Sequence, residues 1–292
     1  MARQEIEPTE LFAAARGGDR LARARLLSVV ERGGHDARAI GRITYPLSGS
    51  AYTVGLTGAP GAGKSTLTSA VTAHLRSLGS PVAVLAIDPS SPFTGGAILG
   101  DRVRMQEHAT DEGVFIRSMA TRGHLGGLSL ATSEAIRVLD ALGSPWILVE
   151  TVGVGQVEVE IAGKADTTVV VVNPGWGDSV QANKAGLMEV ADVFVINKSD
   201  RKGSAETKRD LEQMLDLSDL GESAWRPPIV QTTATTSSGI SEMWDAVLAH
   251  REFTTKSGEL QRRREVRLRH ELREIIERRL EDRARQVCTG SR

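Results

Sequence analysis

The sequence predicts an α/β fold: a doubly wound, mostly parallel sheet with helical extensions at both ends of the chain. Two observations predict it. Short runs of consecutive apolar residues recur along the 292 residues and alternate with helical patterns. Several runs are apolar at every position, as strands covered on both faces of a parallel sheet require. The chain is also long enough to bury a full α/β core.

The elements follow in order. Residues 10–32 are apolar at helical spacing, and Gly17-Gly18 divides them into two short helices. Seven strands are predicted at 54–57, 82–87, 114–116, 146–149, 168–172, 193–196 and 229–231. The helices predicted after the first strand cover 64–78, 101–108, 129–142, 179–189, 205–215 and 240–250. A charged amphipathic helix is predicted at 256–285. We therefore expect a helical extension at 1–50, the sheet domain at 51–253 and a C-terminal helical segment at 254–292.

A complete phosphate-loop pattern follows the first strand. Gly58, Gly61 and Gly63 leave no Cβ in the way of a polyphosphate, so successive backbone N–H groups can point at its oxygens. Lys64 would reach the β- and γ-phosphates, and Ser65 would offer its hydroxyl to Mg²⁺. This strand–loop–helix context predicts a P-loop nucleoside triphosphate site. The residues predicted to bind phosphate are Gly58, Ala59, Pro60, Gly61, Ala62, Gly63, Lys64, Ser65 and Thr66.

A second motif indicates the base. Asn197-Lys198-Ser199-Asp200 follows the strand at 193–196, and the Asp200 carboxylate can accept from N1–H and the exocyclic amine of guanine. Adenine offers no such donor pair, so Asp200 predicts GTP and GDP as ligands. Asn197 and the stem of Lys198 would hold the ring. Thr233 and Ala234, after the next strand, would complete the pocket, with the backbone N–H of Ala234 directed at guanine O6.

Three acidic residues are candidates for the environment of Mg²⁺, which prefers hard oxygen ligands. Asp88 ends a strand, Asp101 opens a predicted helix and Glu150 closes another strand. Asp101 could instead serve only as a helix N-cap. Glu150 and Gly153 form an acid-x-x-Gly pattern in which the Gly N–H contacts the γ-phosphate. Because Val154 and no glutamine follows Gly153, we expect slow intrinsic hydrolysis that a partner accelerates.

Composition excludes other classes. A formal charge of −1 argues against a nucleic-acid surface, and no apolar run approaches the ~18 residues that span a membrane. Residues 1–10 contain three glutamates and no apolar core, so we expect a cytoplasmic protein. The single cysteine, Cys288, can form no internal disulfide.

With these motifs in place, the chain resembles the methylmalonyl-CoA mutase-associated GTPases, the MeaB/ArgK/MMAA family of P-loop G proteins. The resemblance covers nearly the whole chain and is carried by motifs between about residues 52 and 200. These are 58–65, 88–91, 94–96, 100–102, 104–105, 150–156, 177–178, 181, 184–186, 189, 191–192 and 197–200.

The resemblance implies a homodimeric GTPase that acts as chaperone for an adenosylcobalamin-dependent acyl-CoA mutase and gates its cofactor loading. Matched by position, Lys64 and Ser65 hold phosphate and Mg²⁺, and Asn197 and Asp200 read guanine. Asp88, Asp101 and Glu150 surround the metal. Asp178, Gln181 and Lys184 match an extra switch that signals nucleotide state to the mutase. The segment after Phe253 is shorter than is usual in the family, where it builds a dimerisation arm.

Alternative functions stay open. A GTPase that inserts nickel has a similar fold but needs His or Cys ligands, and the six histidines stand at no ligand spacing. A kinase or ATPase of arginine/ornithine transport would use ATP, against which Asp200 argues. A signal-recognition GTPase would need an RNA- or signal-binding domain. The sequence does not indicate which acyl-CoA mutase is the client.

Overall fold

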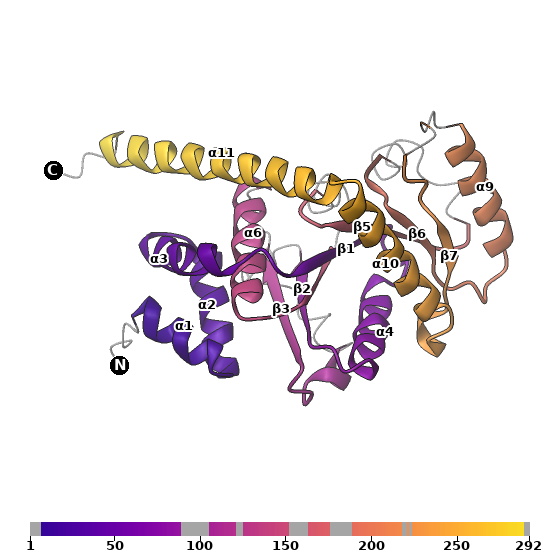
Figure 1. The fold of residues 1–292 in the computed structure, drawn as a ribbon, viewed down its shortest axis with the longest axis horizontal. Coiled ribbons are helices and arrows are strands. Elements are labelled where there is room, and N and C mark those ends of the chain that lie inside the picture. Colours follow the sequence, from indigo (N-terminus) through magenta and orange to yellow (C-terminus); the bar gives the residue numbers. More distant parts are fainter. Residues whose placement is uncertain are drawn as a thin grey trace.

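The computed structural model describes residues 7–88, 105–120, 125–151, 163–175, 189–217, 221 and 224–288. At its centre lies one seven-stranded sheet in the order β3-β2-β4-β1-β5-β6-β7, in which every pair of neighbours is parallel (Figure 1). The strands are β1 Tyr52–Gly58, β2 Val82–Asp88, β3 Val114–Ala120, β4 Trp146–Thr151, β5 Thr167–Val172, β6 Val193–Ile196 and β7 Ile229–Gln231. The predicted α/β sheet is therefore confirmed.

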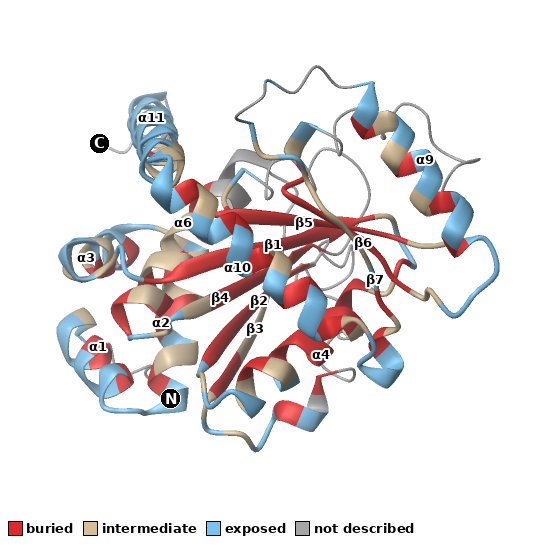
Figure 2. Ribbon diagram, turned by 45° about the vertical axis from the view of Figure 1, so that its right-hand side comes forward, coloured by how far each residue is buried: buried red, intermediate tan, exposed pale blue. Residues whose placement is uncertain are grey.

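Helices cover both faces of this sheet. The helices of the sheet domain and the C-terminus are α4 Lys64–Ser77, α6 Leu125–Ala141, α9 Ser204–Asp216, α10 Ile240–Lys256 and α11 Glu259–Cys288. α4 and α10 pack with one set of alternate strand residues, whereas α6 and α9 pack on the opposite face. Figure 2 shows the consequence: β1, β5 and β6 are buried along their length, whereas the edge strand β7 is partly exposed and α11 is mostly exposed.

The N-terminal helices form an additional layer. α1 Pro8–Arg16, α2 Arg20–Arg32 and α3 His35–Thr44 lie over α6, and a 3₁₀ turn at Tyr45–Leu47 leads into β1. Two helices are predicted here and three are present. The helix that was not predicted is α3, whose Ile40 is fully buried in the cluster that includes α6.

The C-terminal segment differs from its prediction in one respect. α10 continues to Lys256 through the boundary expected at residue 253, and the helix predicted to begin at 256 begins at Glu259. Gly258, with φ +74°, provides the left-handed residue at the break. The proposed boundaries at 50 and 253 stay predictions.

Two predicted helices fall largely outside the described residues. From 101–108 the structure describes a 3₁₀ turn at Gln106–His108, and from 179–189 it describes only the last residue. Among the described helices, none is both long and apolar enough to cross a membrane.

Candidate functional site

The phosphate loop joins the carboxyl end of β1 to the start of α4, and two of its glycines are required by close approach. Gly58 has φ +135°, and a Cβ there would lie 2.0 Å from the carbonyl oxygen of Val171 on β5. Gly63 has φ +89°, and its Cβ would lie 2.5 Å from Nδ2 of Asn197. A side chain at either position would displace the neighbouring atoms, so both positions require glycine.

Two lysines cross this loop. Nζ of Lys64 donates to the carbonyl oxygens of Gly58, at 2.5 Å, and Ala59, at 3.2 Å. Nζ of Lys198 donates to the carbonyl oxygen of Gly61 at 2.6 Å. Both ammonium groups thus lie at the loop that a polyphosphate would occupy, and phosphate oxygens are stronger acceptors for them than backbone carbonyls. The other predicted loop residues, Pro60, Ala62 and Thr66, lie in the same strand–loop–helix unit.

Asn197 connects three loops. Its Nδ2 donates to the carbonyl oxygen of Ala62 at 2.9 Å. Its Oδ1 accepts from Oγ1 of Thr232 at 3.2 Å and from the backbone N–H of Ala234 at 3.1 Å. Asn197 and Thr232 are buried. The predicted base motif, the phosphate loop and the loop after β7 are thereby brought together, and this contact explains how Asn197 would act: it positions the loops.

The base-reading carboxylate lies at the surface of this assembly. Asp200 is exposed, and its Oδ1 accepts from Oγ1 of Thr233 at 3.4 Å. The hydroxyl of Thr233 also lies 3.1 Å from that of Ser199. Thr233 is therefore placed to orient the loop that carries Asp200. With φ +59°, Lys198 is one of two non-glycine residues in the described chain with left-handed backbone, which is a frequent property of functional loops.

The carboxyl end of β4 brings a buried acid to the phosphate loop. Oε1 of Glu150 accepts from Oγ of Ser65 at 2.5 Å, and Glu150 is 0% exposed. β2 is the neighbour of β4, and Asp88 is its last residue, so the backbone places Asp88 at the same edge. The side chain of Asp88 lies outside the described part. A hydroxyl and a buried carboxylate form the hard oxygen donor set that suits Mg²⁺.

Other predicted site residues lie outside the described residues. They are Asp101, Gly153, Asp178, Gln181 and Lys184. Their roles and those of the residues above stay predictions. Among the described residues, no group of three or more His, Cys, Asp and Glu side chains could hold a metal ion.

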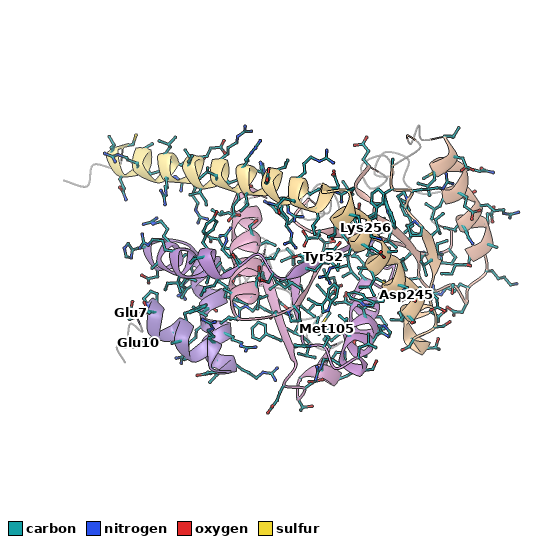
Figure 3. The ribbon with its side chains drawn as sticks, viewed as in Figure 1. Glu7, Glu10, Tyr52, Met105, Asp245 and Lys256 are labelled. Atoms are coloured by element: carbon teal, nitrogen blue, oxygen red, sulfur yellow. The ribbon has the colours of Figure 1, made fainter. Side chains whose placement is uncertain are left out.

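Sequence reasoning missed Thr232. Its contact with Asn197 joins residues 35 positions apart, and the only sequence signal was a polar residue directly after a strand. It also did not predict that Oε1 of Glu150 accepts a hydrogen bond from the Ser65 hydroxyl. Figure 3 labels Tyr52, the first residue of β1, at the end of that strand opposite the phosphate loop. Lys256, the last residue of α10, is labelled near it.

Comparison with known proteins identifies the family. The model of "Methylmalonyl Co-A mutase-associated GTPase MeaB" matches residues 21–289. A Pyrococcus abyssi protein whose name describes it as a GTPase is 56% identical over 269 residues, which cover 91% of this chain and 83% of the relative. The GTPase ArgK of Escherichia coli is 38% identical over 268 residues, covering 89% and 81%.

A solved structure is also similar. The crystal structure of the LAO/AO transport system kinase superposes with a TM-score of 0.78 at 28% sequence identity, over 97% of this chain and 87% of that one. The chain therefore belongs to the family of methylmalonyl Co-A mutase-associated GTPases called MeaB.

Proposed function

We propose that this GTPase is a chaperone that gates cofactor loading of an adenosylcobalamin-dependent acyl-CoA mutase and protects or reactivates it. Membership of the MeaB family supports the mutase as client, because the family description names that association. The contacts of Asn197 with Ala62, Thr232 and Ala234 support guanine-nucleotide recognition. That junction is the observation on which the nucleotide assignment rests.

The proposed binding uses the residues at the carboxyl ends of the strands. The phosphates are bound by Nζ of Lys64 and by the backbone N–H groups of 58–63, except Pro60, which has none, and Asp200 accepts from the guanine donors. Ser65, Glu150, Asp88 and Asp101 are the residues that would hold Mg²⁺, whose charge would offset that developing on the transferred phosphoryl group. The N–H of Gly153 contacts the γ-phosphate.

Signalling to the mutase is assigned to Asp178, Gln181 and Lys184, by resemblance alone. We also propose a homodimer in the cytoplasm. Residues 254–292 are its proposed contact, because α11 carries exposed apolar side chains at Ile276, Leu280 and Val287. Apolar side chains exposed along one helix indicate a surface for protein association.

The experiment that tests this function is GTP hydrolysis by the purified chain, alone and with each adenosylcobalamin-dependent acyl-CoA mutase of the same organism. We expect slow turnover alone and strong stimulation by one mutase. The Lys64→Ala variant is the control, because any GTP hydrolysis that it retains would come from contaminating GTPases. Stimulation by no mutase, with GDP binding intact, would contradict the chaperone role.

A second candidate follows from the name of the similar solved structure, a transport system kinase. Such a kinase would transfer phosphate from ATP. Competition between GDP and ADP for the purified chain distinguishes the two, and preference for ADP would favour the kinase. The guanine-selective geometry expected of Asp200 argues for GDP.

A further inference from the structure

The first turn of α9 lies between two loops at the carboxyl ends of the strands. Ser204 is the first residue of α9, and its Oγ accepts from Nε2 of Gln231, the last residue of β7, at 2.7 Å. One turn further, Oγ1 of Thr207 accepts from the backbone N–H of Gly175, in the loop after β5, at 3.3 Å. Ser204 is 6% exposed and Thr207 is 3% exposed. This turn therefore joins the loop after β5 to the end of β7.

The buried face of α9 changes character at this turn. Thr207, Leu211 and Leu215 follow one another at intervals of four residues, so they lie on one face of the helix. Leu211 and Leu215 pack in a core cluster with residues of β5 and β6, and Figure 1 shows α9 beside β6 and β7. Hydroxyl groups replace leucine side chains where the helix meets the loops, because the donors there need acceptors.

The same turn directly follows the loop that carries Asp200, residues 197–203, which we call the base loop. Gly203, with φ +92°, is the N-cap of α9. A Cβ at Gly203 would lie 3.7 Å from Cβ of Pro174, so the end of the base loop lies against the loop after β5. Only three residues separate Asp200 from Ser204. The first turn of α9 therefore fixes one end of the base loop.

The other end of the base loop is held by backbone hydrogen bonds. The N–H of Asn197 donates to a carbonyl oxygen of β5 at 2.8 Å, and the N–H of Ser199 donates to that of Thr232 at 3.0 Å. Between the two fixed ends, Asp200 is exposed, and its Oδ1 accepts from Oγ1 of Thr233 at 3.4 Å. That distance is long for a bond from a hydroxyl to a carboxylate. The backbone of the base loop therefore sets the position of the carboxylate.

We propose that Ser204 and Thr207 are positioning residues for guanine recognition, because their hydroxyls hold the first turn of α9 and thereby aim the carboxylate of Asp200 at the base. The inference rests on the proposed base site at Asp200. One carboxylate must accept from two guanine donors at once, so a small displacement of the base loop weakens both bonds. The proposed phosphate contacts are made by residues 58–65 of β1 and α4, so loss of either hydroxyl leaves them in place.

Both hydroxyls can be removed without leaving a buried donor unpaired. Gln231 and Gly175 are exposed, so water can accept from their N–H groups in Ser204→Ala and in Thr207→Val. Valine keeps the shape of threonine, and alanine favours the helical conformation. Both variants are therefore expected to fold.

Competition with labelled GDP, which measures the affinities of GDP and ADP for the full chain, tests the proposal. We expect the ratio of GDP to ADP affinity to fall about fivefold in Ser204→Ala and in Thr207→Val, as loss of one hydrogen bond implies. The affinity for ADP should stay within about twofold of the wild type, because adenine does not use Asp200. Thr207→Ser keeps the hydroxyl and should restore the wild-type ratio.

The matched controls remove hydroxyls from another helix. Thr255→Val changes an exposed threonine of α10, and Ser241→Ala changes an exposed serine in the first turn of that helix. Both controls should keep the wild-type ratio of GDP to ADP affinity, since neither residue lies at the base loop.

Three results would overturn the positioning role. They are a wild-type ratio in Ser204→Ala or Thr207→Val, an equal fall in the affinities for GDP and ADP, and a ratio in Thr207→Ser as low as in Thr207→Val. Asp200→Asn, measured alongside, separates this role from the base site. If only Asp200→Asn lowers the ratio, the base site stands and the positioning role is wrong. If Asp200→Asn leaves the ratio unchanged, the base site is wrong, and the positioning role with it.

Discussion

The two ends of the central sheet hold charged side chains in different ways. At the carboxyl ends, the ammonium groups of Lys64 and Lys198 donate to carbonyl oxygens of the phosphate loop. At the amino ends, the carboxylates of Asp166 and Asp192 are held by arginines of α11. Contacts of the first kind can be exchanged for contacts to a ligand, whereas those of the second kind complete the fold.

The amino end shows why ion pairs are required there. Asp166 directly precedes β5 and accepts from the backbone N–H of Thr53 at 3.0 Å, and Asp192 directly precedes β6 and accepts from that of Thr168 at 2.8 Å. Each carboxylate thus satisfies a buried donor of a neighbouring strand. A buried anion needs a cation, which Arg264 supplies at 2.6 Å to Asp166 and Arg263 at 2.9 Å to Asp192.

The pKa values of Asp166 and Asp192 reflect the same balance between burial and ion pairing. Burial opposes ionisation of Asp166, yet the hydrogen bond from Arg264 and the charges of Arg267 and Arg264 hold its pKa below the usual range. Burial likewise opposes ionisation of Asp192. There His250, whose Nε2 lies 3.1 Å from Oδ1, and Arg263 lower the pKa. The amino end therefore stays charged at neutral pH and anchors the first turns of α11.

The substitution with the largest expected effect removes the ion pairs of Asp166. Asp166→Asn leaves Arg264 and Arg267 without their buried anion, so we expect the free energy of unfolding to fall by about 3 kcal/mol, measured by urea denaturation. GDP affinity should change less than about twofold, because the nucleotide-binding loops lie at the other end of the sheet. Asp36→Asn, on an exposed side chain, is the control.

The same variant has a pH signature. Because the pKa of folded Asp166 is lowered, its stabilisation is present above the unfolded value of about 4 and is lost as pH falls through the folded pKa. The difference between wild type and Asp166→Asn should therefore shrink below about pH 4. An unchanged difference from pH 7 to pH 3 would show that the carboxylate charge is not the cause.

The next largest effect is expected at the carboxyl ends of the strands. Lys64→Ala should weaken GTP binding by about 100-fold or more, because charge-assisted hydrogen bonds to phosphate are lost. Unfolding stability should change little, measured in parallel by urea denaturation. Lys208→Ala, at a partly exposed lysine of α9, is the matched control. GTP affinity within threefold of the wild type would exclude Lys64 from the phosphate site.

A smaller effect concerns selectivity. Asp200→Asn should lower the ratio of GTP to ATP affinity by about tenfold, since an amide cannot accept from two guanine donors as a carboxylate does. Competition with labelled GDP measures both affinities. If the ratio stays at its wild-type value, the base site has been assigned to the wrong residue.

The smallest effect tests the loop junction. Thr232→Val keeps the shape of the side chain and removes the hydroxyl that donates to Asn197, so GDP should bind about fivefold more weakly, equivalent to about 1 kcal/mol. Thr236→Val, at an exposed threonine of the same loop, is the control. Equal affinities of both variants would mean that the backbone N–H of Ala234 is sufficient to orient Asn197.

Prediction from the sequence succeeded where the signal was local. Each of the seven strands is a short apolar run, and the phosphate loop is contiguous, so their presence is independent of distant residues. α3 was missed because its burial comes from contact with α6, about ninety residues away in the chain. Thr232 was missed because its partner Asn197 is 35 residues distant.

The sequence by itself determined the α/β class, the strand positions, the phosphate loop and the guanine motif, because each depends on neighbouring residues and backbone chemistry. Only the tertiary structure decided that Asn197 joins three loops, that Glu150 contacts Ser65, and that arginines of α11 hold Asp166 and Asp192. These contacts link residues 35 to 135 positions apart in the chain. Such pairs form only when strand order brings them together, and no local pattern encodes strand order.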